Sequence, residues 1–176
     1  GNANAQYDLG NCYFNGQGVD ENIETALKWY SKAAENGNVK AQTALATCME
    51  RGIGMEMDLF KAFEWYKKSA MGGDDVAQYN LARYYYYGIG VERDYGLAVE
   101  WFTRSAKQGN PDAQYRLGSC YYYGIGVEQN YNIAVDWFKK TAEQGNIDAL
   151  CILGNSYQLG QGVAQNYTAA VDCFRK

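Results

Sequence analysis

Residues 109–144 read GNPDAQYRLGSCYYYGIGVEQNYNIAVDWFKKTAEQ, and this pattern returns every 36 residues along the chain. One tryptophan marks four successive copies of the pattern, at Trp29, Trp65, Trp101 and Trp137. A fixed period of about 20–50 residues is the signature of a repeat architecture, in which each repeat is one supersecondary structure. The period divides the chain into five repeats, the last of them incomplete: 1–36, 37–72, 73–108, 109–144 and 145–176.

The first half of each repeat is predicted to be a helix. In the fourth repeat Asn110 can cap the helix start, because its side-chain oxygen accepts a hydrogen bond from a free backbone N–H. Pro111 follows at the first helical position, where its missing N–H costs nothing. Ala113 and Leu117 are four residues apart and therefore share one face. Gly124 is expected to end the helix, because glycine adopts the left-handed conformation at low cost.

The second half of each repeat is predicted to be another helix. Asn130 is its expected N-cap, and Ala134, Phe138 and Thr141 form its buried stripe. Gly145 is expected to end it. One pair of helices cannot bury its apolar face alone, so neighbouring repeats stack. We therefore predict an all-α fold, a right-handed superhelical solenoid of five 36-residue helix-turn-helix repeats that forms a single array over residues 1–176.

Small residues occupy one position of every first helix, where close packing of helices is expected. A glycine inside a helix costs about 1 kcal/mol relative to alanine. Its use at three equivalent positions indicates that a close approach of the next helix offsets this cost. The row consists of Gly10, Ala46, Ala82, Gly118 and Gly154.

The cysteines indicate free thiols rather than a disulfide framework or a metal centre. Their number is five, no Cys-x-x-Cys occurs, and histidine is absent, so no usual ligand set for structural zinc exists. We expect no metal and no cofactor. Cys12, Cys48 and Cys120 share one repeat position with Tyr84 and Ser156, which favours a packing role. Free thiols favour a reducing compartment.

The net charge of −4 disfavours nucleic acid as a partner, because nucleic-acid binders need a basic surplus to neutralise phosphates. No run of 18 apolar residues occurs, so we expect a soluble chain without direct membrane insertion. No signal peptide is visible. The last repeat stops four residues short, and we expect the sequence to be part of a longer protein, in which a signal or anchor would lie elsewhere.

The repeat motif resembles the Sel-one-like repeat family, which belongs to the tetratricopeptide-like α-solenoids. The motif is Ala-Gln-Tyr-x-Leu-Gly-x-x-Tyr-x-x-Gly-x-Gly-Val followed by Ala-x-x-Trp-(Tyr/Phe)-x-x-x-Ala-x-x-Gly-Asn, and the resemblance covers the whole chain. The residues that carry it in the fourth repeat are Ala113, Gln114, Tyr115, Leu117, Gly118, Tyr121, Gly124, Gly126, Val127, Ala134, Trp137, Phe138, Ala142, Gly145 and Asn146.

Two repeats depart from this motif. The second has Met49 in place of tyrosine and Met55 in place of valine, and the fifth has Leu150 for glutamine and Cys173 for tryptophan. The departures affect local packing and leave the predicted fold unchanged. The resemblance implies a scaffold or adaptor that binds a protein or a peptide, because members of the family share protein binding. It does not identify the ligand.

In helical solenoids the first helix of each repeat lines the concave surface, where a partner is expected to bind. The second repeat offers Lys40, Thr43, Thr47, Glu50 and Arg51 there as exposed positions. Tyrosine and arginine dominate binding hot spots, because they give a large contact area together with a polar group. The predicted partner-binding residues are Tyr7, Asn11, Phe14, Tyr79, Arg83, Tyr86, Tyr115, Ser119, Tyr122 and Asn155.

A purely structural role is the alternative for several of these residues. The rings of Tyr79, Tyr86, Tyr115 and Tyr122 could simply pack between helices, and Arg83 could pair with a nearby acid. We expect Tyr79, Arg83, Tyr86, Tyr115 and Tyr122 to form the centre of the groove. The run Tyr84–Tyr87 cannot be buried as a whole, because four successive helical residues point all round the axis.

Catalysis is not expected. Without histidine, a Ser-His-Asp or Cys-His system cannot form. The five Gly-x-Gly segments follow predicted helices rather than strands, so they are turns and not a dinucleotide fingerprint. Two rival functions remain. One is a structural spacer or a self-assembling array, in which exposed ends associate end to end. The other is a glycan or small-molecule site among the tyrosine rings.

Overall fold

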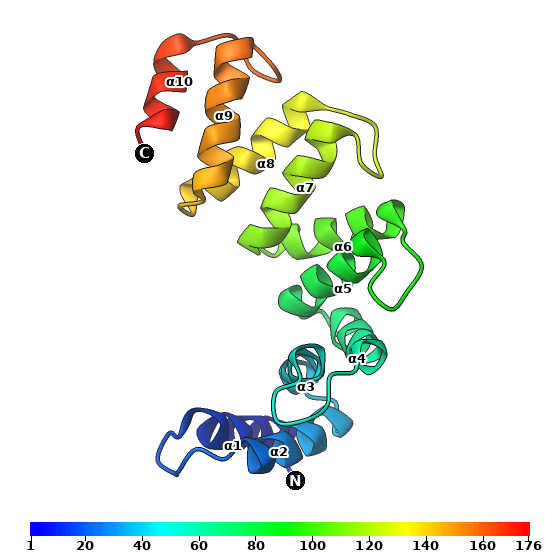
Figure 1. Ribbon diagram of the computed structural model, residues 1–176. Helices are drawn as coiled ribbons and strands as arrows, with labels where there is room; N and C mark the ends of the chain where they lie inside the picture. The colour runs from blue at the N-terminus through cyan, green and yellow to red at the C-terminus, as the bar shows by residue number, and fades with distance from the viewer. The chain divides into compact units, whose positions relative to one another are not determined.

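The computed structural model describes all 176 residues and contains ten helices and no strand (Figure 1). The all-α prediction of paired helices is therefore confirmed. The first helices of the five repeats are α1 (Ala3–Asn15), α3 (Val39–Arg51), α5 (Asp75–Tyr87), α7 (Pro111–Tyr123) and α9 (Ile147–Leu159). The second helices are α2 (Ile23–Glu35), α4 (Leu59–Met71), α6 (Tyr95–Lys107), α8 (Tyr131–Glu143) and α10 (Tyr167–Phe174).

The chain forms two compact units, residues 1–92 and residues 93–176, which are described separately. The first unit holds α1 to α5 and the second holds α6 to α10. Within each unit every helix packs against the helix that follows it in the sequence. The division falls inside the third repeat, between α5 and α6, and a single array of all five repeats stays a prediction. None of the ten helices combines the length and the apolar composition that crossing a bilayer requires.

Every helix begins at an asparagine or aspartate cap, as the sequence predicted for the fourth repeat. The Asn110 side-chain oxygen accepts a hydrogen bond from the backbone N–H of Ala113 at 3.0 Å, and Pro111 opens α7. Asn130 caps α8 in the same way. Gly124 ends α7 with φ +71°, the left-handed conformation that glycine adopts cheaply. Local chemistry thus sets the helix ends before any packing is considered.

The core of the fourth repeat contains the predicted stripe of its second helix. In α8, Ala134, Phe138 and Thr141 are fully buried, which confirms the predicted stripe. The row of small residues is confirmed as a site of close approach. A Cβ atom added at Gly118 would lie 2.9 Å from the Phe138 ring. The glycine therefore lets α8 approach α7 closely.

The second glycine of the Gly-x-Gly turn makes a contact in the last two repeats that the sequence did not reveal. Gly126 has φ +72°, and a Cβ atom there would overlap the backbone carbonyl of Tyr95, the first residue of α6. The equivalent Gly162 meets the backbone of Tyr131 in the same way. Gly18, in the first repeat, has φ +75° and nothing within 4 Å. In the fourth and fifth repeats the turn thus rests on the main chain of the preceding repeat, whereas Gly54 of the second repeat faces the side chains of Ile23 and Leu27.

All five cysteines are unpaired in the structure. The position that Cys12, Cys48 and Cys120 share with Tyr84 and Ser156 is buried in the last four repeats, where its packing role is confirmed, and half-buried at Cys12. Burial raises the pKa of the Cys48 and Cys120 thiols, to about 11 for Cys120. These thiols therefore stay protonated near neutral pH.

We expect the thiols to react with iodoacetamide at very different rates at pH 8. The thiolate is the reactive form, so Cys120, with a pKa of about 11, is slow, whereas the exposed Cys151 reacts fast. Mass spectrometry of timed samples measures both rates. Labelling in denaturant is the control, because it removes the difference due to burial. Equal rates in the folded protein would contradict the burial of Cys120.

Candidate protein-binding surface

In each unit the first helices carry outward-facing side chains: α1, α3 and α5 in the first unit, and α7 and α9 in the second. We call these side chains the first-helix face of each unit. The ten predicted partner-binding residues are all accessible. Asn155 is exposed, and nine are half-buried: Tyr7, Asn11, Phe14, Tyr79, Arg83, Tyr86, Tyr115, Ser119 and Tyr122.

An acid–base pair lies on this face in the first unit. The Glu50 carboxylate on α3 accepts a hydrogen bond from the Tyr66 hydroxyl at 2.9 Å and lies 3.5 Å from Arg83 Nη1 on α5. Arg83 also donates to Asn80 Oδ1 at 2.8 Å. The side chain of Glu50 is 15 % exposed and that of Arg83 is 30 % exposed. The alternative that Arg83 pairs with an acid is confirmed, and a pair of this exposure contributes about 0–1 kcal/mol.

Tyr66 is a buried residue that supports this surface, and the sequence analysis did not single it out. Its ring is fully buried in α4, yet its hydroxyl reaches Glu50 and lies 3.0 Å from the Thr47 hydroxyl. Burial raises its pKa, so the hydroxyl remains a neutral donor. The signal was present in the sequence, because the equivalent residue is tyrosine in the first two repeats and phenylalanine in the last three.

The first repeat has an equivalent contact, in which a buried tyrosine of the second helix hydrogen-bonds to a polar side chain of the first helix. The Tyr30 hydroxyl of α2 donates to Asn11 Oδ1 at 2.8 Å. The rings of Tyr7 and Phe14 each lie 5.9 Å from the Tyr30 ring, one on either side of Asn11 along α1. The structure therefore brings Tyr7, Asn11 and Phe14 together around one buried ring. Their orientations are fixed before any partner arrives.

Two adjoining pockets lie at the amino-terminal ends of α1, α3 and α5. One, of about 440 Å³, is lined by Asn4, Tyr7, Asp8 and residues 37–40. The other, of about 380 Å³, shares Tyr7 and Lys40 and extends to Asp74, Asp75 and Val76. A shallow hollow thus runs across three first helices within the first unit, with carboxylates and one lysine at its edges.

Thr43 lies at the floor of this hollow, and the expectation that it is exposed was wrong. Its hydroxyl donates to Asp74 Oδ1 at 2.9 Å and lies 2.7 Å from the Ser69 hydroxyl. Ser69 in turn donates to the Val39 carbonyl at 2.7 Å. Three helices meet at Thr43, and their shared hydroxyl network buries it. This network closes the floor of the hollow and makes it polar.

In the second unit the first-helix face is aromatic. The Tyr122 ring packs edge-on against Tyr123 at 5.0 Å and Tyr131 at 5.1 Å, and its hydroxyl donates to Gln161 Oε1 at 3.0 Å. Tyr115 packs on Phe138 at 5.9 Å. Burial raises the pKa of Tyr115 and of Tyr122, so both phenols stay neutral. The rings of Tyr115 and Tyr122 therefore pack against the core on one side and remain accessible to solvent on the other.

The predicted centre of the groove is only partly assembled by these contacts. Arg83 lies over the Tyr79 ring at 6.0 Å, and Tyr86 packs on Tyr87 at 4.9 Å, both within the first unit. Tyr115 and Tyr122 meet at Phe138 in the second unit. A joint site of all five residues would span both units and stays a prediction.

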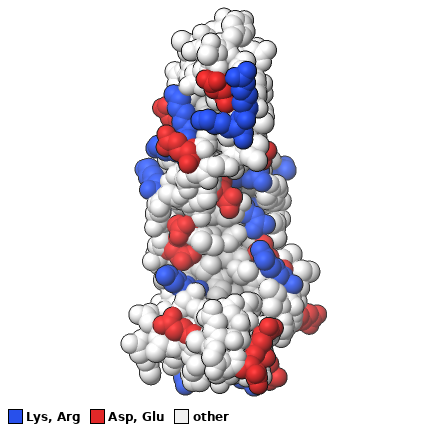
Figure 2. Space-filling view, turned by 90° about the vertical axis from the view of Figure 1, so that its left-hand side faces the viewer, with Lys and Arg blue, Asp and Glu red and all other residues white.

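Charged side chains of both signs are mixed on the surface (Figure 2), and conventional metal ligands do not cluster. On the face shown in Figure 2, acidic and basic side chains are interspersed over a largely uncharged surface. No group of three or more His, Cys, Asp or Glu side chains is placed to hold a metal ion. What the first-helix face offers is fixed rings, amides and one ion pair, which suit recognition of a polypeptide.

Comparison with known proteins identifies the repeat. The model of the Sel1 repeat matches residues 3–38, 39–74, 75–110, 111–146 and 147–176. Among solved structures, the chain resembles c5321, a protective antigen of uropathogenic Escherichia coli strains that displays an SLR fold. The identity is 36 % and the TM-score 0.93 over 98 % of this chain, which corresponds to 37 % of the E. coli chain. The chain thus spans little more than a third of that relative.

Two further structures show how far the likeness extends. A Sel1 repeat protein from Oxalobacter formigenes shares 33 % identity, with a TM-score of 0.91 over 99 % of this chain and 72 % of that chain. The immunity protein Pa5087 from Pseudomonas aeruginosa shares 25 % identity, with a TM-score of 0.59 over 97 % of this chain and 63 % of that chain. No curated protein matches the sequence.

Proposed function

Because the chain belongs to the Sel1 repeat family, we propose that it is a scaffold that binds a protein or peptide on its first-helix face. A protein-binding role is typical of this family, and its solenoid fold is typically non-catalytic. The observation that carries the proposal is the fixed set of half-exposed aromatic rings on that face. Rings held in place lose little side-chain entropy when a partner covers them.

The two units support this proposal in different ways. In the first, the hollow between Tyr7 and Asp75 has a polar floor and charged edges, and the Glu50–Arg83 pair lies further along α3 and α5. This arrangement suits polar and charged groups of a partner. In the second, Tyr115 and Tyr122 offer ring edges with neutral hydroxyls. Such amphipathic rings give contact area and a hydrogen bond together.

We expect the double variant Tyr79→Ala, Tyr115→Ala to lose partner capture while its helical content remains unchanged. Both rings are half-exposed, and truncation of a hot-spot tyrosine costs about 2 kcal/mol or more, or about 30-fold in affinity. The measurement is quantitative affinity capture from the native cell with the immobilised chain, together with circular dichroism. Phe60→Ala is the matched control, because Phe60 is an exposed aromatic residue on a second helix.

Recovery of the same partners by the double variant would disprove the assignment of the surface. The rival functions give different results. A self-assembling array predicts light scattering that grows with protein concentration and no partner for the unmodified chain. A glycan site predicts binding to a glycan array that the double variant loses.

A further inference from the structure

A small pocket recurs at the same place in two repeats, between the Gly-x-Gly turn and the start of the second helix. In the second repeat it has a volume of about 410 Å³ and is lined by Met49, Met55, Glu56, Met57, Asp58 and Lys61. In the fourth it has a volume of about 390 Å³ and is lined by Tyr121, Val127, Glu128, Gln129, Asn130 and Ile133. The two sets correspond position by position. The pocket therefore belongs to the repeat, and its lining sets what it can bind.

The lining of the second repeat is unusual because three of its residues are methionines. The chain has four methionines in all, and Met71 is the fourth. Every other repeat has tyrosine at the position of Met49 and valine at that of Met55. At the position of Met57 the other repeats have only charged or amide side chains, Glu21, Arg93, Gln129 and Gln165.

Core packing accounts for only part of this change. Met49 and Met55 pack against the core cluster of the first unit, and a larger residue at one position offsets a smaller one at the other. Met57 is 60 % exposed and supports no core. Core packing therefore does not explain why Met57 replaces a charged or amide side chain. Its position next to the thioethers of Met49 and Met55 suggests a shared role for the three sulfur atoms.

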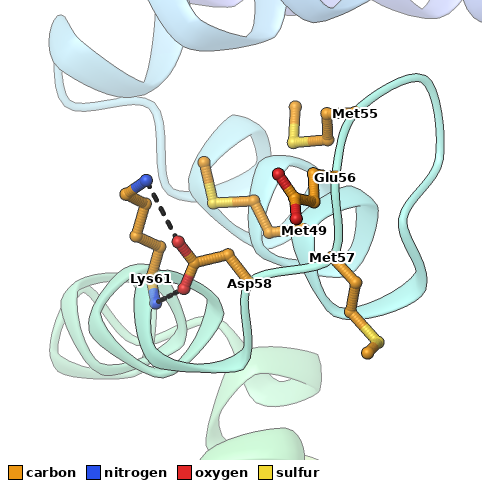
Figure 3. A pocket seen from close by; sticks show the side chains of 6 residues that line it. All are labelled: Met49, Met55, Glu56, Met57, Asp58 and Lys61. Atoms are coloured by element: carbon orange, nitrogen blue, oxygen red, sulfur yellow. Dashed lines mark hydrogen bonds and ion pairs between the residues drawn. The ribbon is translucent and has the colours of Figure 1, made fainter.

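The side chains converge on one space from two elements. Figure 3 shows Met49 from the end of α3 and Met55 from the turn pointing toward the same region, with the Glu56 carboxylate beside them. Met57 points away on an exposed, flexible stem. Lys61 lies 3.0 Å from Asp58 and is neutralised by it, so Glu56 keeps an uncompensated negative charge at the pocket.

We propose that this pocket binds a soft monovalent metal ion, Cu(I) or Ag(I), through the thioether sulfurs of Met49 and Met55. Thioethers are soft ligands that select Cu(I) over hard cations such as Mg²⁺ and Ca²⁺. The Glu56 carboxylate offsets the charge of the ion. The unbranched Met57 supplies a third thioether when its stem turns inward. This site is independent of partner binding on the first-helix face.

The test uses Ag(I) and the chain labelled with ¹³C at the methionine methyl groups. Thiols compete for Ag(I), so the accessible cysteines are first replaced by Cys12→Ser, Cys151→Ser and Cys173→Ser, while the buried thiols are retained. We expect the methyl resonances of Met49 and Met55 to shift with one equivalent of Ag(I). Met71, which is 73 % exposed at the end of α4, is the internal reference and stays unchanged.

Two variants complete the design. Met49→Tyr with Met55→Val restores the residues of the other repeats and therefore preserves the fold. It is expected to weaken Ag(I) binding at least about tenfold. Loss of a residue that only contacts a metal ligand already costs about 10–100-fold in affinity, and this variant removes two ligands themselves. Met71→Leu leaves binding unchanged. Equal shifts of all four methyl groups, no shift at all, or unaltered affinity in the restored variant would each overturn the proposal.

Discussion

The substitution Phe138→Ala is expected to destabilise the second unit by about 3–5 kcal/mol, the usual cost of removing a large buried aromatic side chain. Phe138 is fully buried in α8, and its ring lies against Gly118 of α7. Tyr115 and Tyr122 rest on the same ring at 5.9 Å and 6.2 Å. The cavity left by alanine cannot collapse easily, because the Tyr122 ring is also held by Tyr131 and by the hydrogen bond to Gln161.

Urea denaturation followed by circular dichroism measures this loss. Phe60→Ala provides the same chemical change at a residue that is 64 % exposed, and should alter stability by no more than about 0.5 kcal/mol. The loss of Phe138 also removes the support of Tyr115 and Tyr122, so partner capture should weaken even where the variant is still folded. A Phe138→Ala protein as stable as Phe60→Ala would show that this ring does not hold α7 and α8 together.

Gly126→Ala is expected to cost about 2–5 kcal/mol, from two sources. The left-handed conformation at φ +72° costs a non-glycine residue about 1–2 kcal/mol. The added Cβ would also overlap the backbone carbonyl of Tyr95, and overpacking of this kind costs about 1–3 kcal/mol. A rigid main chain cannot move aside as the end of a flexible side chain can.

Gly18→Ala separates the two sources. Gly18 occupies the same repeat position with φ +75°, and nothing lies within 4 Å of its added Cβ. It should therefore cost only the conformational part, about 1–2 kcal/mol. The difference between the two variants in denaturation measures the contact between repeats. An equal cost for both would mean that this contact contributes nothing to stability.

The fold could be predicted from the sequence to a large extent, because the information for it is local. Asn110 and Gly124 determine helix ends by their own chemistry, and an equivalent cap residue and an equivalent glycine recur every 36 residues in all five repeats. The buried stripe of α8 follows from spacing alone. The left-handed conformation of Gly124 and the turns at the Gly-x-Gly segments were likewise expected, although not the contact made by Gly126.

The binding surface could be predicted only in outline, because its details depend on partners distant in sequence. The accessibility of Tyr79 and Tyr115 follows from the phase of one helix. The burial of Thr43 depends on Ser69 and Asp74, 26 and 31 residues away. The pair of Glu50 and Arg83 joins residues 33 apart. No pattern within a single helix reports such contacts.

The contact beneath the turn glycines makes the repeat tolerant of change elsewhere. In the last three repeats the turn glycine faces main-chain atoms of the preceding repeat, at Leu59, Tyr95 and Tyr131. Main-chain atoms are the same whatever side chains surround them. The spacing between these repeats therefore does not depend on which side chains their first helices carry. The outward residues of one first helix could be exchanged for those of another without altering how the next repeat packs. Such exchange offers a direct route to redesigned specificity.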